Sequence, residues 1–178
     1  IFQDQIIDLF QSAIGAYFSA ESLDTAARDV LYFVSGKIAI DKFPFGVGFG
    51  RFAGFISIKY YSDVYYQYGI DKIWGLTGYE NDASFGTDTF WPYILGELGI
   101  IGLLCFCYFL FKLFQYSLRI IREETDLRVK SFTVAAFIIL LESIFEAFAS
   151  PMYANTTTLF FVLTPIAMVL PGWEMVKR

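Results

Sequence analysis

The stretch GTDTFWPYILGELGIIG, residues 86–102, carries two carboxylates close to the start of an apolar segment. Asp88 precedes the apolar run and Glu97 lies within it. A second apolar segment carries Glu142 and Glu146, one helical turn apart. A charge at the centre of a membrane helix costs about 2.5 to 3.5 kcal/mol. We therefore expect these groups to face a wet cavity, meet a cation or be protonated, and not to face lipid. Glu97 and Glu146 are expected at similar depth in the membrane.

Two arginines upstream are the cations best placed to meet these acids or an anionic substrate. Arg28 shares a helical face with Tyr32 and Ser35, and Arg51 follows a glycine-rich stretch. A guanidinium group suits bidentate binding of a pyrophosphate. The simpler alternative for Arg28 and Arg51 is that each is a surface arginine without a functional role. For the acids, it is that they only pair with arginine or form hydrogen bonds between helices.

The remaining chemistry is limited by what the chain lacks. It has no histidine, the commonest general base and zinc ligand. Cys105 and Cys107 point to different faces of a helix, which argues against a disulfide or a metal pair. Catalysis would then depend on Asp, Glu, Arg, Lys, Tyr or Ser, and no metal or other cofactor is predicted. The aromatic residues from Tyr60 to Trp91 would stack on sugars or form an interfacial belt, with Trp91 the candidate for substrate binding.

The composition indicates a membrane protein. Of the 178 residues, 56% are hydrophobic, 20% aromatic and only 17% charged, and the mean hydropathy is +0.52. The formal charge of -5, without a long basic stretch, argues against nucleic-acid binding. Because the chain starts at Ile1 without a signal-like segment, we interpret it as a fragment of a larger multi-span protein.

Three segments are predicted to cross the membrane as helices: residues 93–111, 132–149 and 157–171. The first carries Glu97 as its only charge, and at about 1.5 Å per residue it matches the roughly 30 Å hydrocarbon thickness. The positive-inside rule places the basic loop 112–131 and the tail 172–178 in the cytoplasm. It follows that residues 20–92 and the turn 150–156 lie outside.

The outer part is predicted to consist of amphipathic helices lying on the membrane. Residues 1–19 form an amphipathic or truncated membrane helix. A second helix, capped by Asp24, ends before Pro44 and has an apolar face made of Ala27, Leu31, Val34 and Ile38. The glycines of FPFGVGFGRF are expected to form a tight turn at the membrane edge, because no strand, βαβ unit or Gly-Lys-Ser/Thr supports a nucleotide loop.

These features together resemble the O-antigen ligase and polymerase superfamily over about residues 27–111. Ligases of that superfamily carry His, then Asn, Ser or Gln, nine residues, Gly, two residues and Gly, where an outer loop enters a span. Here Asp88-Thr89, the nine residues 90–98, and Gly99 and Gly102 keep this spacing. The upstream RDVLYFVSGKIAIDKFPFGVGFGRF is similar to the superfamily's Arg-bearing helix followed by Pro and GxGxGxF. Since Asp88 replaces the ligase histidine, a polymerase fits better than a ligase.

The resemblance implies an all-α, metal-independent glycosyltransferase of the bacterial cytoplasmic (inner) membrane, multi-pass, with its active site on the periplasmic or outer face. Its substrate would be an undecaprenyl-pyrophosphate-linked glycan in the lipid bilayer, with flippase and chain-length regulator proteins as further partners. Arg28 and Arg51 would bind the pyrophosphate, and Asp88 would act as general base. Glu97 would hold an arginine or be the base itself. Tyr32, Trp91 and Glu146 complete the predicted substrate-binding set.

Three other functions remain open. A ligase would transfer glycan to a lipid or protein acceptor through the same site. A transporter or channel component would use the three glutamates, Glu97, Glu142 and Glu146, to line an ion path. A purely structural subunit would tolerate replacement of the carboxylates. Separately, Gly99 and Gly102 are expected to let a neighbouring helix approach closely.

Overall fold

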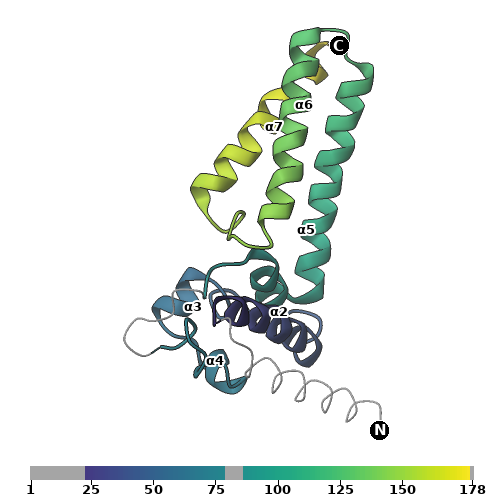
Figure 1. Ribbon diagram of the computed structural model, residues 1–178. Coiled ribbons are helices and arrows are strands. Elements are labelled where there is room, and N and C mark those ends of the chain that lie inside the picture. Colours follow the sequence, from purple (N-terminus) through teal and green to yellow (C-terminus); the bar gives the residue numbers. More distant parts are fainter. Residues whose placement is uncertain (1–22, 79–85, 177–178) are drawn as a thin grey trace.

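The computed structural model of the chain describes residues 23–78 and 86–176 (Figure 1). The helix expected at residues 1–19 lies outside this range. All regular structure within it is helical: α2 (Leu23–Asp41), α3 (Phe55–Lys59), α4 (Asp63–Gln67), α5 (Phe90–Glu123), α6 (Leu127–Glu146) and α7 (Thr156–Val176). The all-α prediction is therefore confirmed for the described residues.

The helices form two layers. The long helices α5, α6 and α7 run side by side as a bundle, and α2, α3 and α4 gather at one end of it, as Figure 1 shows. We call residues 23–78 the cap. Within the cap, α2 packs directly against α5, so the first turns of α5 are shared between the cap and the bundle.

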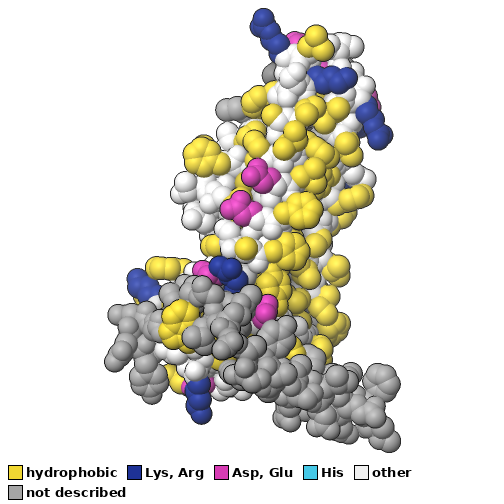
Figure 2. Space-filling model, in the orientation of Figure 1, with side chains coloured by type: hydrophobic (Ala, Val, Ile, Leu, Met, Phe, Trp, Pro, Cys, Tyr) yellow, Lys and Arg dark blue, Asp and Glu magenta, His cyan; other side chains and the backbone are white. Residues whose placement is uncertain are grey.

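Among the described helices, α5 is the one long and apolar enough to cross a membrane. It begins at Phe90, slightly earlier than predicted, because Pro92 fits the first turn of a helix, where its missing N–H is not needed. Its length and composition support membrane association. Figure 2 shows hydrophobic side chains covering much of the visible bundle surface, as a lipid or protein environment would require.

The predicted cytoplasmic loop 112–131 is largely helical. Helix α5 continues to Glu123 and α6 begins at Leu127, which leaves only residues 124–126 between them. No glycine or proline interrupts this stretch, Arg119 and Glu123 form an ion pair one turn apart at 3.1 Å, and Asp126 caps α6 by accepting a hydrogen bond from the Arg128 N–H. The charged residues of 112–131 correctly predicted a polar segment, but the two helices continue into this segment and leave only a short loop.

The periodicity of α2 is confirmed by its packing. Its predicted apolar face, Ala27, Leu31, Val34 and Ile38, is at most 3% exposed. This face meets Phe52, Tyr65 and Leu76 from the rest of the cap. The cap thus has its own core, and that core fixes the opposite face of α2, which carries Arg28 and Tyr32.

Candidate functional site

The candidate site is built around a break in α5. At Gly99 the backbone leaves helical geometry (φ 67°, ψ −163°). The carbonyl groups of Gly96 and Glu97 accept hydrogen bonds from Val47 N–H and Gly48 N–H, each at 2.9 Å. The segment 44–54, which we call the glycine loop, therefore docks on the break and satisfies backbone groups that a continuous helix would pair internally.

Two glycines make this docking possible. Gly46 has a φ of +70°, and a Cβ added to it would collide with the carbonyl oxygen of Gly96. Gly99 also has a positive φ, and its Cβ would collide with the carbonyl oxygen of Pro44. The expected tight turn is confirmed. The expected role of Gly99 is wrong, because its close neighbour is a loop and not another helix.

Glu97 fastens the glycine loop from below. Its side chain is 0% exposed, and its Oε1 accepts a hydrogen bond from Phe52 N–H at 3.1 Å. The backbone amides of Gly50 and Arg51 also interact favourably with the carboxylate. Glu97 thus holds the backbone that carries Arg51 and makes no ion pair with a described arginine. Its Oε2 is buried without a hydrogen-bond partner among the described residues.

A cavity of about 550 Å³ opens above Glu97. The glycine loop and α3 form one wall, and the turn between α6 and α7 forms another. Its polar lining consists of Thr87, Tyr93, Glu97 and Asn155, and the apolar lining includes Phe49 and Phe55. Glu97 therefore lies at the lining of a cavity, while its own side chain is fully buried. A mixed lining of this kind suits a ligand with both an apolar and a hydroxyl-rich part.

Asp88 directly follows the cavity residue Thr87 and pairs with Arg28. Nη2 of Arg28 lies 3.3 Å from Oδ2 of Asp88, with side chains 40% and 25% exposed. The two residues are 60 positions apart in the chain and meet because α2 packs across the start of α5. The structure thus brings together two of the three residues predicted to carry catalysis. The pair is reachable from solvent and uses one nitrogen of the guanidinium.

Three buried polar atoms without partners in the described part of the chain belong to Arg28 itself or to residues that closely follow Asp88 in the chain. Among the described residues, Nε of Arg28, Oγ1 of Thr89 and Nε1 of Trp91 are buried and make no hydrogen bond. Leaving such groups unpaired costs about 1 to 3 kcal/mol each. Several unpaired groups near one ion pair indicate a place where a polar ligand or ordered water completes the structure.

Tyr32 joins the cap to the adjacent end of the bundle, at the turn that follows α6. Its hydroxyl donates to the carbonyl oxygen of Phe148 at 2.9 Å, and the two rings stack with centroids 6.3 Å apart. Burial raises the pKa of Tyr32 to about 12, so the hydroxyl stays a donor at neutral pH. The ring of Trp91 contacts Phe148 as well. We call Arg28, Tyr32, Asp88, Thr89 and Trp91 the junction cluster.

Arg51 is not brought into the junction cluster. Its Nη2 lies 2.6 and 2.8 Å from the two carboxylate oxygens of Asp63, and both side chains are exposed. The hydrogen bond from Arg51 lowers the pKa of Asp63 below its usual range. In this structure, Arg51 therefore links the glycine loop to α4 through its ion pair with Asp63.

The other two glutamates do not join Glu97. Glu142 and Glu146 are exposed on α6, and neither lines the cavity above Glu97. Figure 2 shows acidic side chains within the apolar surface of the bundle. In the described residues these two carboxylates therefore do not share the site of Glu97, and their predicted role is not tested by this arrangement.

Three residues of the site escaped sequence reasoning: Thr87, Tyr93 and Asn155. Thr89 was noted only for its place in the motif spacing, and its position directly before the start of α5 was a further signal. Asn155 belongs to a turn distant in sequence, and nothing in the sequence pattern links it to the glycine loop.

Comparison with models of known protein families finds none that matches this chain, and comparisons with curated proteins and with solved structures find no match either.

Proposed function

We propose that this chain polymerises undecaprenyl-pyrophosphate-linked oligosaccharide repeat units into a surface polysaccharide, such as an O-antigen, capsule or exopolysaccharide, by inverting glycosyl transfer. The observation that carries the proposal is the Arg28–Asp88 ion pair at 3.3 Å, together with unpaired buried polar atoms in Arg28 and in Thr89 and Trp91, which closely follow Asp88 in the chain. A cation and a carboxylate so placed can serve the leaving group and the nucleophile of one reaction.

The proposed reaction assigns each half of the pair a role. The acceptor sugar hydroxyl attacks the anomeric carbon of the donor, forming the new glycosidic bond as the bond to the lipid pyrophosphate breaks. Asp88 accepts the hydroxyl proton, and Arg28 stabilises the negative charge that develops on the pyrophosphate. When Arg28 turns toward the pyrophosphate it leaves Asp88, whose carboxylate oxygens are then free to accept the hydroxyl proton.

The cavity above Glu97 accepts the sugars in this proposal. Tyr93 and Asn155 supply hydroxyl and amide groups, while Phe49 and Phe55 supply apolar surface. Trp91 has an unpaired indole N–H and is proposed to bind a sugar hydroxyl. Arg51 is proposed to reach substrate only after releasing Asp63.

The membrane arrangement is part of the same proposal. Helix α5 is long and apolar enough to cross a bilayer, and we place α6 and α7 beside it as further spans of a multi-pass protein of the bacterial inner membrane. The basic side chains Lys112, Arg119 and Arg122 lie near the end of α5 remote from the cap. The positive-inside rule then puts the cap and the junction cluster on the periplasmic or outer face.

The test compares surface polysaccharide from cells that make wild type, Arg28→Ala, Asp88→Asn or the control Lys37→Ala, separated by chain length at equal protein levels. Lys37 lies on the same helix as Arg28 but is exposed. We expect single repeat units on lipid in the two site variants and a full ladder in the control. A full ladder in both site variants would overturn the assignment.

The same experiment separates a polymerase from a ligase. Loss of ligation would leave full-length polymer on the lipid carrier, whereas loss of polymerisation leaves a single unit. A second candidate function is ion transport, which would use Glu142 and Glu146, exposed one turn apart on α6, without Glu97. Ion uptake by vesicles that is abolished in Glu142→Gln while the glycan is unchanged would support transport instead.

A further inference from the structure

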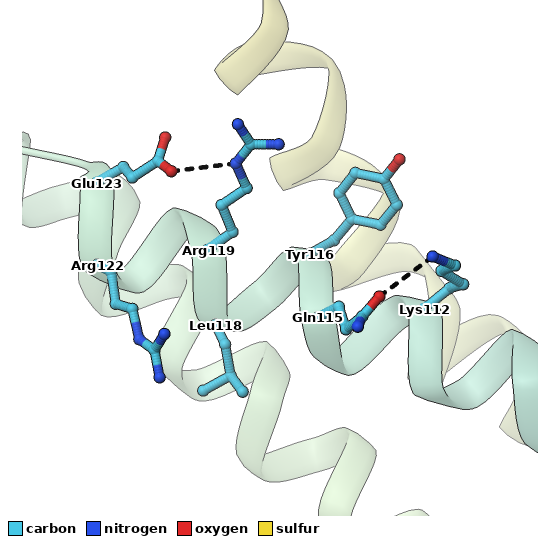
Figure 3. A pocket seen from close by; sticks show the side chains of 7 residues that line it. All are labelled: Lys112, Gln115, Tyr116, Leu118, Arg119, Arg122 and Glu123. Atoms are coloured by element: carbon cyan, nitrogen blue, oxygen red, sulfur yellow. Dashed lines mark hydrogen bonds and ion pairs between the residues drawn. The ribbon is translucent and has the colours of Figure 1, made fainter.

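A second hollow lies at the end of the bundle remote from the cap. It has a volume of about 510 Å³, and its described lining comes entirely from α5: Lys112, Gln115, Tyr116, Leu118, Arg119, Arg122 and Glu123. Figure 3 shows these side chains on successive turns of α5, with the ribbon of α7 passing behind them. We call this hollow the basic groove.

The basic groove carries more positive charge than its own residues neutralise. Arg119 is paired with Glu123 at 3.1 Å. Lys112 donates to the neutral Gln115 at 3.2 Å and also lies over the ring of Tyr108. Arg122 makes no ion pair with any residue that the structure describes, and its side chain is exposed. Two cations of the groove are therefore available to an anion.

The groove also lies where the surface of α5 changes from apolar to charged. Leu104, Phe109 and Phe111 are exposed on the same helix toward the cap. Tyr116 and Leu118, which line the groove, are 44% and 39% exposed. A cationic hollow beside an exposed apolar band matches a molecule with a negative head and apolar chains. Tyrosine is typical of the level at which lipid headgroups lie.

From this arrangement we infer that the basic groove binds the phosphate of an anionic phospholipid, with the acyl chains along the exposed apolar side chains of α5. Arg122 contacts the phosphate from one end of the groove, and Lys112, about three turns nearer the cap, attracts the same negative headgroup from the other end. Gln115 and Tyr116 lie between them and are placed to bind polar headgroup atoms. The inference concerns a site at the opposite end of α5 from the junction cluster and does not depend on glycosyl transfer.

The test measures lipid retained by the purified full-length protein. The protein is taken from detergent containing equal amounts of phosphatidylglycerol and phosphatidylcholine, and bound lipid is counted by native mass spectrometry. The test variant is Lys112→Gln with Arg122→Gln. The matched control is Lys42→Gln with Lys59→Gln, which removes the same charge from the cap. Lys112→Arg tests whether charge alone suffices.

We expect wild type, the cap control and Lys112→Arg to retain phosphatidylglycerol in preference to phosphatidylcholine. The groove variant should bind it roughly thirtyfold more weakly, because each cation near an anionic surface contributes about fivefold. Equal binding by the groove variant, or equal losses in the groove and cap variants, would overturn the inference. Displacement of the lipid by millimolar inorganic phosphate would instead identify a site for free anions and overturn the lipid assignment.

Discussion

Glu97 Oε1 accepts a hydrogen bond from the backbone N–H of Phe52 at 3.1 Å, across 45 positions of the chain. Together with the backbone hydrogen bonds that Val47 and Gly48 donate to α5, this contact fastens the glycine loop to the break and fixes the floor of the candidate site. The hydrogen bond explains why a carboxylate is buried in an apolar helix, whether or not Glu97 takes part in a reaction.

Replacing Glu97 should separate structure from chemistry. Glu97→Ala removes the acceptor of a buried backbone amide, and we expect a loss of about 2 to 3 kcal/mol in the free energy of unfolding. Glu97→Gln keeps an oxygen acceptor and should lose less than half of that. Thermal unfolding of the purified protein measures both. If Glu97→Gln folds like wild type yet makes no polymer, Glu97 has a chemical role and our structural assignment is incomplete.

The break in α5 predicts an unusual glycine requirement. Gly99→Ala would place a Cβ against the carbonyl oxygen of Pro44 at a positive φ, so we expect the folded yield to fall sharply. Gly36→Ala is the control, because nothing lies within 4 Å of its added Cβ, and in a helix it should stabilise by up to about 1 kcal/mol. Size-exclusion profiles of both variants report the outcome. A well-folded Gly99→Ala protein would mean that the glycine loop does not dock as described.

Tyr32 should act as a clamp between the cap and the bundle. Tyr32→Phe keeps the stacked ring but loses the hydrogen bond to the Phe148 carbonyl oxygen, which predicts a loss of about 1 kcal/mol. Tyr32→Ala loses both contacts and should be markedly less stable. Chemical unfolding curves distinguish the two. Equal stability of Tyr32→Phe and wild type would show that stacking alone holds this contact.

The Arg51–Asp63 pair predicts a pH dependence with a defined sign. The pKa of Asp63 lies below its ordinary value of 3.8 because Arg51 donates hydrogen bonds to the carboxylate. A depressed carboxyl pKa stabilises the fold above the ordinary value, and this stabilisation is lost as pH falls through the folded pKa. Because both side chains are exposed, we expect the effect to be small.

In Arg51→Gln, the titration midpoint of the Asp63 carboxyl carbon, followed by NMR, should move up toward 3.8. The stability difference from wild type should vanish at acid pH. Lys59→Gln, which removes a nearby cation without touching the pair, should leave the midpoint unchanged. An unchanged midpoint in Arg51→Gln would mean that the pair does not form in solution.

Sequence reasoning succeeded where a repeating pattern determines the structure. The period of α2 predicted the buried face at Leu31 and Val34, and the apolar run predicted the long helix around Glu97. The prediction was wrong where a local run of charged residues was interpreted as a loop. Charge at residues 112–131 indicates the polar end of a membrane segment, but Arg and Glu are good helix formers, so both helices continue into that stretch.

Long-range contacts were beyond a single sequence. Arg28 and Asp88 were each selected for their chemistry, yet nothing in their spacing predicts that they touch. Arg51, selected on similar grounds, pairs with Asp63 instead. The difference arises from how α2 and the glycine loop dock on α5, and docking depends on packing that no local pattern records.

The most direct test of the central claim uses the purified full-length protein in nanodiscs with undecaprenyl-pyrophosphate-linked repeat units. Chain growth and release of undecaprenyl pyrophosphate are measured together. We predict that wild type yields both and that Arg28→Ala is slower by about 10²- to 10³-fold, the usual cost of losing a group that stabilises developing charge. Wild-type rates in Arg28→Ala, or no chain growth by wild type, would contradict the account.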